Sequence, residues 1–441
     1  MRFYYLFLAL HVSTFLMAEN WPHWRGPKGN GVSPEQGLPE SWSSQENVAW
    51  KAPIKGLGVS SPIVWEDTVF LTAQLGRGTV RPGNHPSLSR GEDSTERALG
   101  ADIESTESED APVHFLIQAF NRLDGSLRWD FLLAAEKDLP QVHSKTNMAA
   151  PSCVTDGEGV YCWFGNGQLV ALSMEGRLMW QRHLAQKDSP FEITWGHNSS
   201  PTLYRDLLIL LCDHTPASYL LALDKKSGQQ RWKADRGKEL RSYSTPMVAE
   251  GKAGDELIVN SSRGLDAYDP ASGKHLWFFE EANRFPVPSP SFGDGTIFTS
   301  RGYRSSPYMA IQPGGRGDIS NTHVRWRVPT GGPYVSSIIY YAGLVFMVNE
   351  AGIVTCADGK TGETVWRMRV GGVFSASPVA GDGKIYLTSE GGEVIVLRAA
   401  RQPEILSRNR LEERCLASPA ISNGLLFVRT DQHLIAVGRM E

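Results

Sequence analysis

The most constraining feature of this chain is a segment pattern that recurs about eight times. Each copy opens with a step of small residues, usually ending in Ser-Pro, and continues with short apolar runs separated by turns that contain Gly or Asp. The opening steps start at Ser60, Ala149, Ser199, Ser244, Pro288, Ser336, Ala376 and Ala417. Most copies close on a tryptophan: Trp129, Trp180, Trp232, Trp277, Trp326 and Trp366. After a longer first unit the spacing is about 40–50 residues, a period typical of β-propellers.

Each copy predicts four short antiparallel strands. In residues 378–399, the turns Gly381–Gly383 and Glu390–Gly392 divide three apolar runs, as successive hairpins require. In the unit that ends at Trp232, a fourth run follows the turn Asp224–Gly228. A single four-stranded sheet cannot bury both faces, whereas a ring of stacked sheets can. We therefore predict an all-β fold, an eight-bladed β-propeller of four-stranded antiparallel blades, with the tryptophans packed between blades.

The ring is expected to close through its N-terminal strand. The last copy, residues 418–437, supplies three strands and no closing tryptophan. The missing strand is found near the other end of the chain, at Asn47–Ile54, which carries Trp50. We predict that this strand pairs with Leu434–Val437, so that residues 47–441 form the propeller and residues 19–46 form a lead segment before it.

The repeat resembles the PQQ-type repeat of eight-bladed propellers. The family includes quinoprotein alcohol dehydrogenases and the BamB propeller lipoproteins, and its secreted members often begin with a segment similar to Trp21–Pro27 here. The resemblance covers residues 21–441 and is specific for the fold. In the dehydrogenases it implies a stacking tryptophan, calcium-binding oxygens, a catalytic Asp and commonly a vicinal disulfide around the quinone. This chain has no adjacent cysteine pair, and its repeat openings hold few carboxylates.

Residues 1–18 have the pattern of a signal peptide. Arg2 precedes an apolar run at Phe3–Met17, and Ala18 is a small residue before the expected cleavage site. A retained anchor is the alternative. No cysteine lies near this site, so the lipid anchor of BamB is not expected here. We predict a periplasmic or secreted monomer with no membrane span after signal removal; the net charge of −4 argues against nucleic-acid binding.

Five cysteines and one long insertion complete the pattern. Cys153 and Cys162 flank the turn Asp156–Gly159, so they face each other across a hairpin and could form a disulfide or remain reduced.

Residues 76–112 interrupt the first blade and are polar and increasingly acidic, which predicts a disordered loop.

Candidate binding residues precede the repeat steps. Closing the ring brings these segments to one end of the central channel, where they form a funnel of aromatic and cationic side chains: His143, Lys145, Trp195, His197, Arg241, Tyr243 and Tyr334. Such a funnel suits a peptide or a small anionic or planar ligand, with tighter binding below about pH 6.5 if the histidines protonate there. The alternative is that these residues cap the channel and bond to one another.

The sequence therefore favours an exported propeller that acts as a binding or assembly scaffold. We expect no cofactor and no catalytic residues, because no hydrolase, zinc or nucleotide-binding motif is present. A PQQ-dependent oxidoreductase that holds PQQ with calcium is the second hypothesis, although no motif supports it. A carbohydrate- or polymer-binding module is the third.

Overall fold

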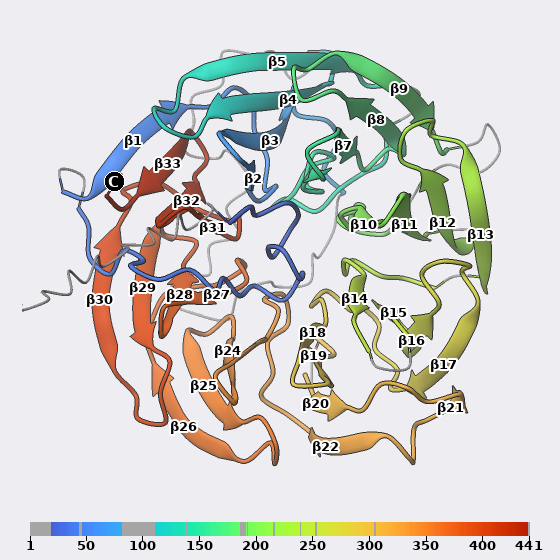
Figure 1. The fold of residues 1–441 in the computed structure, drawn as a ribbon, viewed down its shortest axis with the longest axis vertical. Coiled ribbons are helices and arrows are strands. Elements are labelled where there is room, and N and C mark those ends of the chain that lie inside the picture. Colours follow the sequence, from blue (N-terminus) through green and yellow to red (C-terminus); the bar gives the residue numbers. More distant parts are fainter. Residues whose placement is uncertain are drawn as a thin grey trace, which may run out of the picture.

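The computed structural model describes residues 19–43, 46–81, 111–136, 139–185, 191, 193–214, 217–238, 240–251, 254–303 and 306–439. The predicted signal peptide and most of the predicted loop, residues 82–110, lie outside this part of the chain. The described residues form strands and no helix, arranged as eight sheets around a central axis (Figure 1). The prediction of an all-β, eight-bladed propeller is confirmed.

Each blade runs from an innermost to an outermost strand. Blade 1 contains β2 (Ile63–Trp65), β3 (Thr68–Leu75), β4 (His114–Asn121) and β5 (Leu127–Ala134). Blade 2 contains β6 (Val154–Thr155), β7 (Val160–Trp163), β8 (Gln168–Leu172) and β9 (Leu178–His183). Blade 3 contains β10 (Thr202–Tyr204), β11 (Leu207–Asp213), β12 (Ser218–Asp224) and β13 (Gln230–Gly237). Blade 4 contains β14 (Met247–Ala249), β15 (Glu256–Asn260), β16 (Gly264–Tyr268) and β17 (His275–Glu280), with β21 (Gly317–Asp318) as a fifth strand.

The second half of the ring repeats this arrangement. Blade 5 contains β18 (Ser291–Gly293), β19 (Thr296–Ser300), β20 (Tyr308–Ile311) and β22 (Val324–Val328). Blade 6 contains β23 (Ile339–Tyr341), β24 (Leu344–Val348), β25 (Ile353–Asp358) and β26 (Thr364–Arg369). Blade 7 contains β27 (Val379–Gly381), β28 (Lys384–Thr388), β29 (Glu393–Arg398) and β30 (Ile405–Arg410). Blade 8 contains β31 (Ala420–Ser422), β32 (Leu425–Arg429), β33 (His433–Val437) and β1 (Val48–Pro53).

The ring closes as predicted, by joining the two ends of the chain in blade 8. β1 pairs antiparallel with β33, with Trp50 opposite Ala436 and Pro53 opposite His433. Trp50 is buried in the cluster that blade 8 shares with blade 1. The N-terminal strand therefore supplies the outermost strand of the last blade (Figure 1).

The repeated tryptophans join each blade to the next. Five of them donate their indole N–H to a carbonyl of the following blade at 2.8–3.0 Å: Trp50 to Arg122, Trp129 to Met174, Trp180 to Lys225, Trp326 to Gly359 and Trp366 to Ala400. The indole also covers the turn glycine of the following blade, as Trp180 covers Gly228 and Trp232 covers Gly273. These glycines have positive φ, and a Cβ there would lie within 3 Å of the ring. The turn thus needs glycine for its backbone and for the approach of the indole.

Trp277 in blade 4 is the exception. It is fully buried, and its Nε1 donates to Glu256 Oε2 of its own blade at 2.9 Å. The chain between β20 and β22 of blade 5 contributes β21, which pairs in parallel with β17 outside the usual four strands. Trp277 still lies in a buried cluster with Ile297, Met309 and Ile311 of blade 5, so only its hydrogen-bond partner sets it apart from the other tryptophans.

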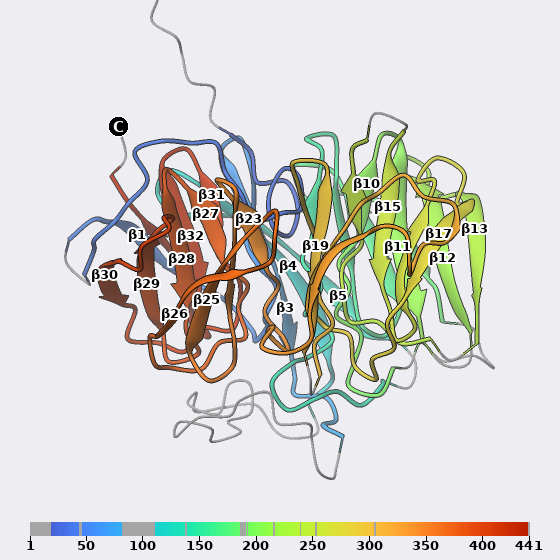
Figure 2. The ribbon, with the colours of Figure 1, turned by 90° about the horizontal axis from the view of Figure 1, so that it is seen from below.

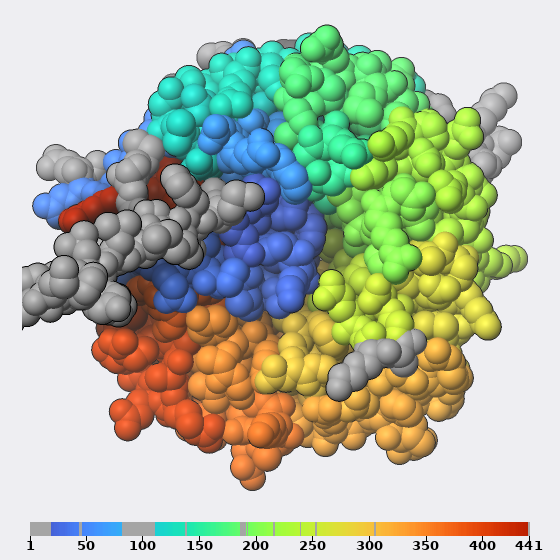
Figure 3. All heavy atoms as spheres, viewed as in Figure 1, coloured from blue at the N-terminus to red at the C-terminus, as the bar shows by residue number. Residues whose placement is uncertain are grey.

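The lead segment crosses one end of the channel before the chain enters the ring. Its residues lie over the axis in the face-on view and along one face in the side view (Figures 2 and 3). Arg25 is fully buried and donates to Ile338 O at 2.6 Å and to Asn30 O at 3.0 Å. Loss of solvent lowers the pKa of Arg25 to about 9. Through this side chain the lead segment is bound to blade 6, on the far side of the ring from its own pairing with blade 1.

Candidate functional site

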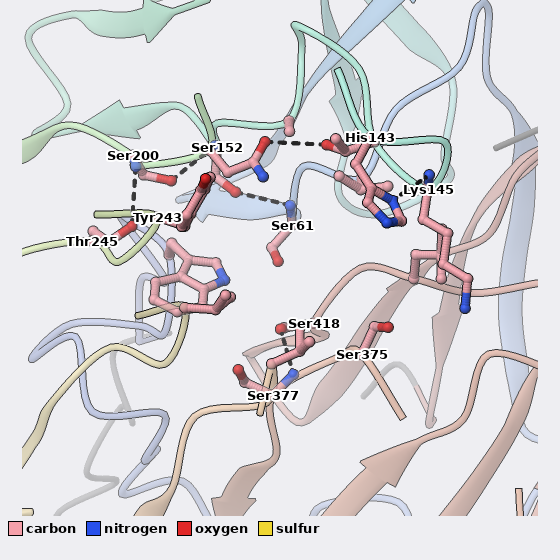
Figure 4. Close-up of a pocket in the computed structure, with 18 of the residues that line it drawn as sticks. Ser61, His143, Lys145, Ser152, Ser200, Tyr243, Thr245, Ser375, Ser377 and Ser418 are labelled. Carbon is pink, nitrogen blue, oxygen red and sulfur yellow. Dashed lines mark hydrogen bonds between the residues drawn. The ribbon is translucent and has the colours of Figure 1, made fainter. Parts of the chain in front are cut away.

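A belt of hydroxyl groups surrounds the channel at the start of the innermost strands. At the repeat steps, the residue before the proline position, or in blade 2 the residue after it (Ser152), donates its backbone N–H to the side-chain oxygen of the corresponding residue in the next blade. Seven such bonds of 2.8–3.0 Å run in order through Ser61, Ser152, Ser200, Thr245, Ser289, Ser337, Ser377 and Ser418. Figure 4 shows parts of this belt on opposite sides of the channel. The residues of the recurring step thus join neighbouring blades by hydrogen bonds.

The remaining junction, between blades 8 and 1, is joined by an arginine. Arg429 of β32 donates to Thr72 O at 2.7 Å and to Ser60 O at 3.2 Å. The side chain is buried, and desolvation lowers the pKa of Arg429 to about 10. The junction that closes the ring therefore has a charged donor in addition to the pairing of β1 with β33.

A cavity of about 190 Å³ occupies the channel between this belt and the loops that precede it. Five of the seven predicted residues line it: His143, Lys145, Trp195, Tyr243 and Tyr334. Figure 4 shows His143, Lys145 and Tyr243 around the same space as the belt serines. Ring closure thus brings together residues almost 200 positions apart, as the repeat predicted.

Aromatic side chains form most of one wall. Trp195 lies at 5.8 Å from the His143 ring and at 6.3 Å from Phe285, measured between centroids. Tyr303 continues the wall between Phe285 and Tyr334, at 5.1 and 5.3 Å. Desolvation raises the pKa of Tyr243 and of Tyr334, so both phenols stay protonated at neutral pH. The wall offers flat apolar faces with neutral hydroxyl groups.

Lys145 is the one Lys or Arg among the described residues that line the cavity, and an ion pair compensates its charge. Its Nζ lies 2.9 Å from Glu390 Oε2, a residue of blade 7, and both side chains are largely buried. Ser375 also donates to this carboxylate. The sequence predicted a cationic funnel for anionic groups, whereas the structure shows an ion pair. The cavity is therefore close to neutral and suits planar or apolar groups better than free anions.

Two predicted residues do not line the cavity. Arg241 lies beside it in the same loop as Tyr243 and is partly exposed. His197 is 2% exposed, packs against the rings of Trp163 and Phe191, and donates from Nε2 to Leu211 O at 3.1 Å. Burial lowers the pKa of His197 to about 3, so the expected protonation near pH 6.5 does not hold for this residue.

Two contributors to the cavity were not predicted from the sequence. Trp24 of the lead segment lines its inner end, and the belt serines line its middle. The first has a signal in the tryptophan-rich motif at Trp21–Pro27, and the second in the repeated Ser-Pro step. We call the end of the channel where the segments before the repeat steps gather the mouth. There Val80 pairs in parallel with Val142, so the start of the long loop lies beside the predicted residues.

The paired cysteines meet as the hairpin predicted. The sulfurs of Cys153 and Cys162 lie 2.8 Å apart, both are buried, and both are free thiols in the structure. A disulfide between them stays a prediction. Burial raises the pKa of the Cys162 thiol well above its usual range.

The oxygen atoms that line the cavity can be compared with the ligands that calcium would need to hold a quinone there. Among the described residues that line the cavity, the side-chain oxygens come from hydroxyl groups and from the amide of Asn198, and none comes from a carboxylate. Calcium binds six to eight oxygen ligands and usually takes carboxylates among them. Glu390 bonds to Lys145 and Ser375, and Glu413 lies in blade 8, where it bonds to Lys51 and His433. Across the described residues, no group of three His, Cys, Asp or Glu side chains is placed to hold a metal ion. The residues present do not fit PQQ with calcium.

The fold and the cavity define an eight-bladed propeller of the PQQ-repeat class with a closed inner end and an aromatic mouth. The family model described as outer membrane protein assembly factor BamB matches residues 41–194, 114–368 and 350–439. The chain therefore belongs to this family. A search of curated proteins gave no match.

Solved structures agree on the fold. The quinohemoprotein alcohol dehydrogenase ADHIIG of Pseudomonas putida HK5 is 11% identical, with a TM-score of 0.59 over 96% of this chain and 81% of that one. BamB from Moraxella catarrhalis is 15% identical, with a TM-score of 0.52 over 78% of this chain and 96% of the other. The computationally designed protein Ika8 is 9% identical, with a TM-score of 0.55 over 89% and 99%. Identities this low show a common fold and do not carry an activity.

No helix among the described residues is both long and apolar enough to cross a bilayer.

Proposed function

We propose that the protein is an exported binding scaffold whose docking site is the cavity at the channel mouth. The description of its family as an outer membrane assembly factor supports export and a role in holding other molecules. The observation that carries the proposal is an aromatic cavity in which Glu390 neutralises the ammonium group of Lys145. Such a site is suited to binding through shape and stacking.

The occupant that fits is a flat or aromatic side chain of a partner protein, or a planar small molecule. Neutral phenols at Tyr243 and Tyr334 offer hydrogen bonds, and Trp195 and Phe285 offer stacking faces. A free anion would have to compete with Glu390 for Lys145, which costs a buried ion pair.

The test is partner capture by immobilised full-length protein from the envelope fraction of the native cells. Trp195→Ala and Tyr334→Ala are expected to weaken capture per folded molecule at least tenfold, since they remove stacking surface. The matched control is Trp129→Ala, a partly exposed tryptophan between blades 1 and 2 that does not line the cavity. It should lower stability and leave capture by the folded fraction unchanged.

Equal capture by all variants would contradict the proposal. Titration of the purified protein with PQQ and calcium is the second arm of the test. Saturable binding accompanied by dye-linked alcohol oxidation would replace the scaffold with a quinoprotein oxidoreductase.

A further inference from the structure

The lead segment shows how this propeller binds an extended chain at the end of the channel opposite the mouth. In blade 1, Trp21 and Val64 exchange two backbone hydrogen bonds, both of 2.8 Å. In blade 7, Ser33 N donates to Ala380 O at 2.8 Å and Ala380 N donates to Gly31 O at 2.9 Å. The lead segment thus forms an isolated β-bridge, antiparallel in blade 1 and parallel in blade 7, with the inner edges of two blades.

The residues that accept the lead segment hold one defined place in the repeat. Val64 and Ala380 are the middle residues of β2 and β27, each a strand of three residues. Along an antiparallel pair, residues alternate between those that bond to the neighbouring strand and those whose N–H and C=O point away from it. The middle residue of an innermost strand therefore presents both groups to the channel axis.

Leu203 and Val248 hold the same place in blades 3 and 4. Leu203 pairs with Leu208 in the middle of β10, and Val248 pairs with Leu257 in the middle of β14. The lead segment also bonds to blade 2 through Thr155, to blade 5 through Phe292 and to blade 8 through Ser422. Among the described residues, it makes no hydrogen bond to blade 3 or blade 4. In the described part of the chain, blades 3 and 4 are thus the two blades whose inner edges receive neither a bridge nor a single hydrogen bond from the lead segment.

A cleft of about 550 Å³ lies over these two edges. Leu203 and Val248 lie on one side, and His23, Trp24 and residues 27–30 of the lead segment lie on the other. The space-filling view shows the surface hollowed between the lead segment and blades 3 and 4 (Figure 3). Trp24 separates this cleft from the cavity at the mouth, since it lines both.

The charges around the cleft indicate the chemistry of its occupant. Glu250, Asp255 and Asp294 line it, and none of these carboxylates forms an ion pair with another described residue. Asp255 accepts a hydrogen bond from Tyr204 at 2.9 Å, and Asp294 accepts one from Tyr340. The cationic lining residues in the described part of the chain, Lys28 and Arg205, are fewer than these carboxylates. An occupant with basic side chains meets more opposite than like charge.

We propose that this cleft docks an extended, basic segment of a partner protein. Its backbone pairs with Leu203 and Val248 as the lead segment pairs with Val64 and Ala380, and its basic side chains meet Glu250, Asp255 and Asp294. Recognition is by added strand, in which main-chain bonds give affinity and flanking charges give preference. The inference deepens the proposed scaffold role, on which it rests, and uses a surface separate from the mouth.

The test is fluorescence anisotropy of the full-length protein with a labelled peptide of sequence Lys-Val-Lys-Val-Lys. Saturable binding is expected, and methylation of alternate backbone nitrogens in the peptide should weaken it at least tenfold, because those N–H groups pair with the inner edges. The Glu-Val-Glu-Val-Glu peptide should bind more weakly than the lysine peptide. Glu250→Gln should weaken the lysine peptide about two- to fivefold, as expected for a solvent-exposed ion pair, whereas Glu363→Gln, a control on the exposed outer turn of blade 6, should have no effect.

Val248→Pro removes the inward-pointing N–H and should weaken binding about tenfold; proline is tolerated on a strand edge whose N–H is unpaired. No saturable binding, equal affinity for the methylated peptide, or tighter binding of the glutamate peptide would each overturn the inference. Dimerisation that Val248→Pro abolishes, measured by sedimentation, would assign the cleft to a second copy and also overturn it. Trp195→Ala should not change peptide affinity, so failure here leaves the mouth proposal standing.

Discussion

The contact between Trp180 and Gly228 gives the sharpest test of how the blades are joined. Gly228 has φ of +68°, and a Cβ built on it would lie 2.8 Å from the Trp180 indole. Gly383 has nearly the same backbone, with φ of +69°, and a Cβ there meets nothing within 4 Å. Only Gly228 faces the indole of the preceding blade. Comparing substitutions at the two glycines therefore separates the cost of backbone strain from the cost of packing against the indole.

Gly383→Ala should cost about 1–2 kcal/mol, the penalty for an L-residue in the left-handed region. Gly228→Ala carries the same penalty plus about 1–3 kcal/mol for overpacking against the indole. Trp180→Ala should destabilise by about 2–4 kcal/mol, below the range for a fully buried aromatic because the ring is partly exposed. In the Trp180→Ala background, Gly228→Ala should cost no more than Gly383→Ala, because the obstructing ring is gone.

The assay is guanidinium unfolding followed by far-UV circular dichroism, which does not depend on the tryptophan being replaced. Coupling between the two sites of about 1–3 kcal/mol is expected from contacts of this kind. Equal costs for Gly228→Ala and Gly383→Ala, or strict additivity with Trp180→Ala, would refute the inter-blade role of the indole.

Three further predictions use the same structure. Burial lowers the pKa of His197 to about 3, whereas the side chain titrates near 6.5 in the unfolded chain, so between these pH values the unfolded state binds one more proton. The free energy of unfolding should therefore fall as the pH drops from 6.5 toward 3, by up to about 1.4 kcal/mol per pH unit. Denaturant titrations at several pH values should show that His197→Phe loses this pH dependence. Arg25→Ala should lower the melting temperature and speed proteolysis of the lead segment, because Ile338 and Asn30 lose their buried donor; an unchanged cleavage rate would show that the segment is held by other contacts. Mild oxidation should join Cys153 to Cys162 with loss of two hydrogens in the intact mass, and a thiol-blocking label on both after oxidation would show that no disulfide forms.

The fold could be predicted from the sequence because every blade repeats the same local signals. The Ser-Pro steps, turn glycines and closing tryptophans set strand order and blade number, and the strand with Trp50 could be assigned because one blade lacked it. The strand β21 and the hydrogen bond from Trp277 to Glu256 could not be predicted, since the extra strand comes from an irregular connection in the next blade.

The candidate site was predicted in position and less well in chemistry. Position follows from topology, because residues before equivalent steps must gather at one end of the ring. Charge does not follow from topology: Glu390 lies 245 positions from Lys145 and belongs to a turn in another blade. For the same reason the burial of His197 depends on Trp163 and Phe191, whose side chains reach it from elsewhere in blade 2 and its connection.

The measurement that tests the scaffold account most directly is site-specific photocrosslinking in the native cells. Tyr334→p-benzoylphenylalanine places the crosslinker in the cavity. Leu132→p-benzoylphenylalanine places it on β5, the outermost strand of blade 1, where the side chain of Leu132 is 53% exposed and Leu127 is a second exposed leucine. The account predicts a discrete crosslinked partner at Tyr334 that Trp195→Ala abolishes, and none at Leu132. A partner captured at Leu132 with nothing at Tyr334 would contradict it, and would move the binding surface from the channel to the outer strands.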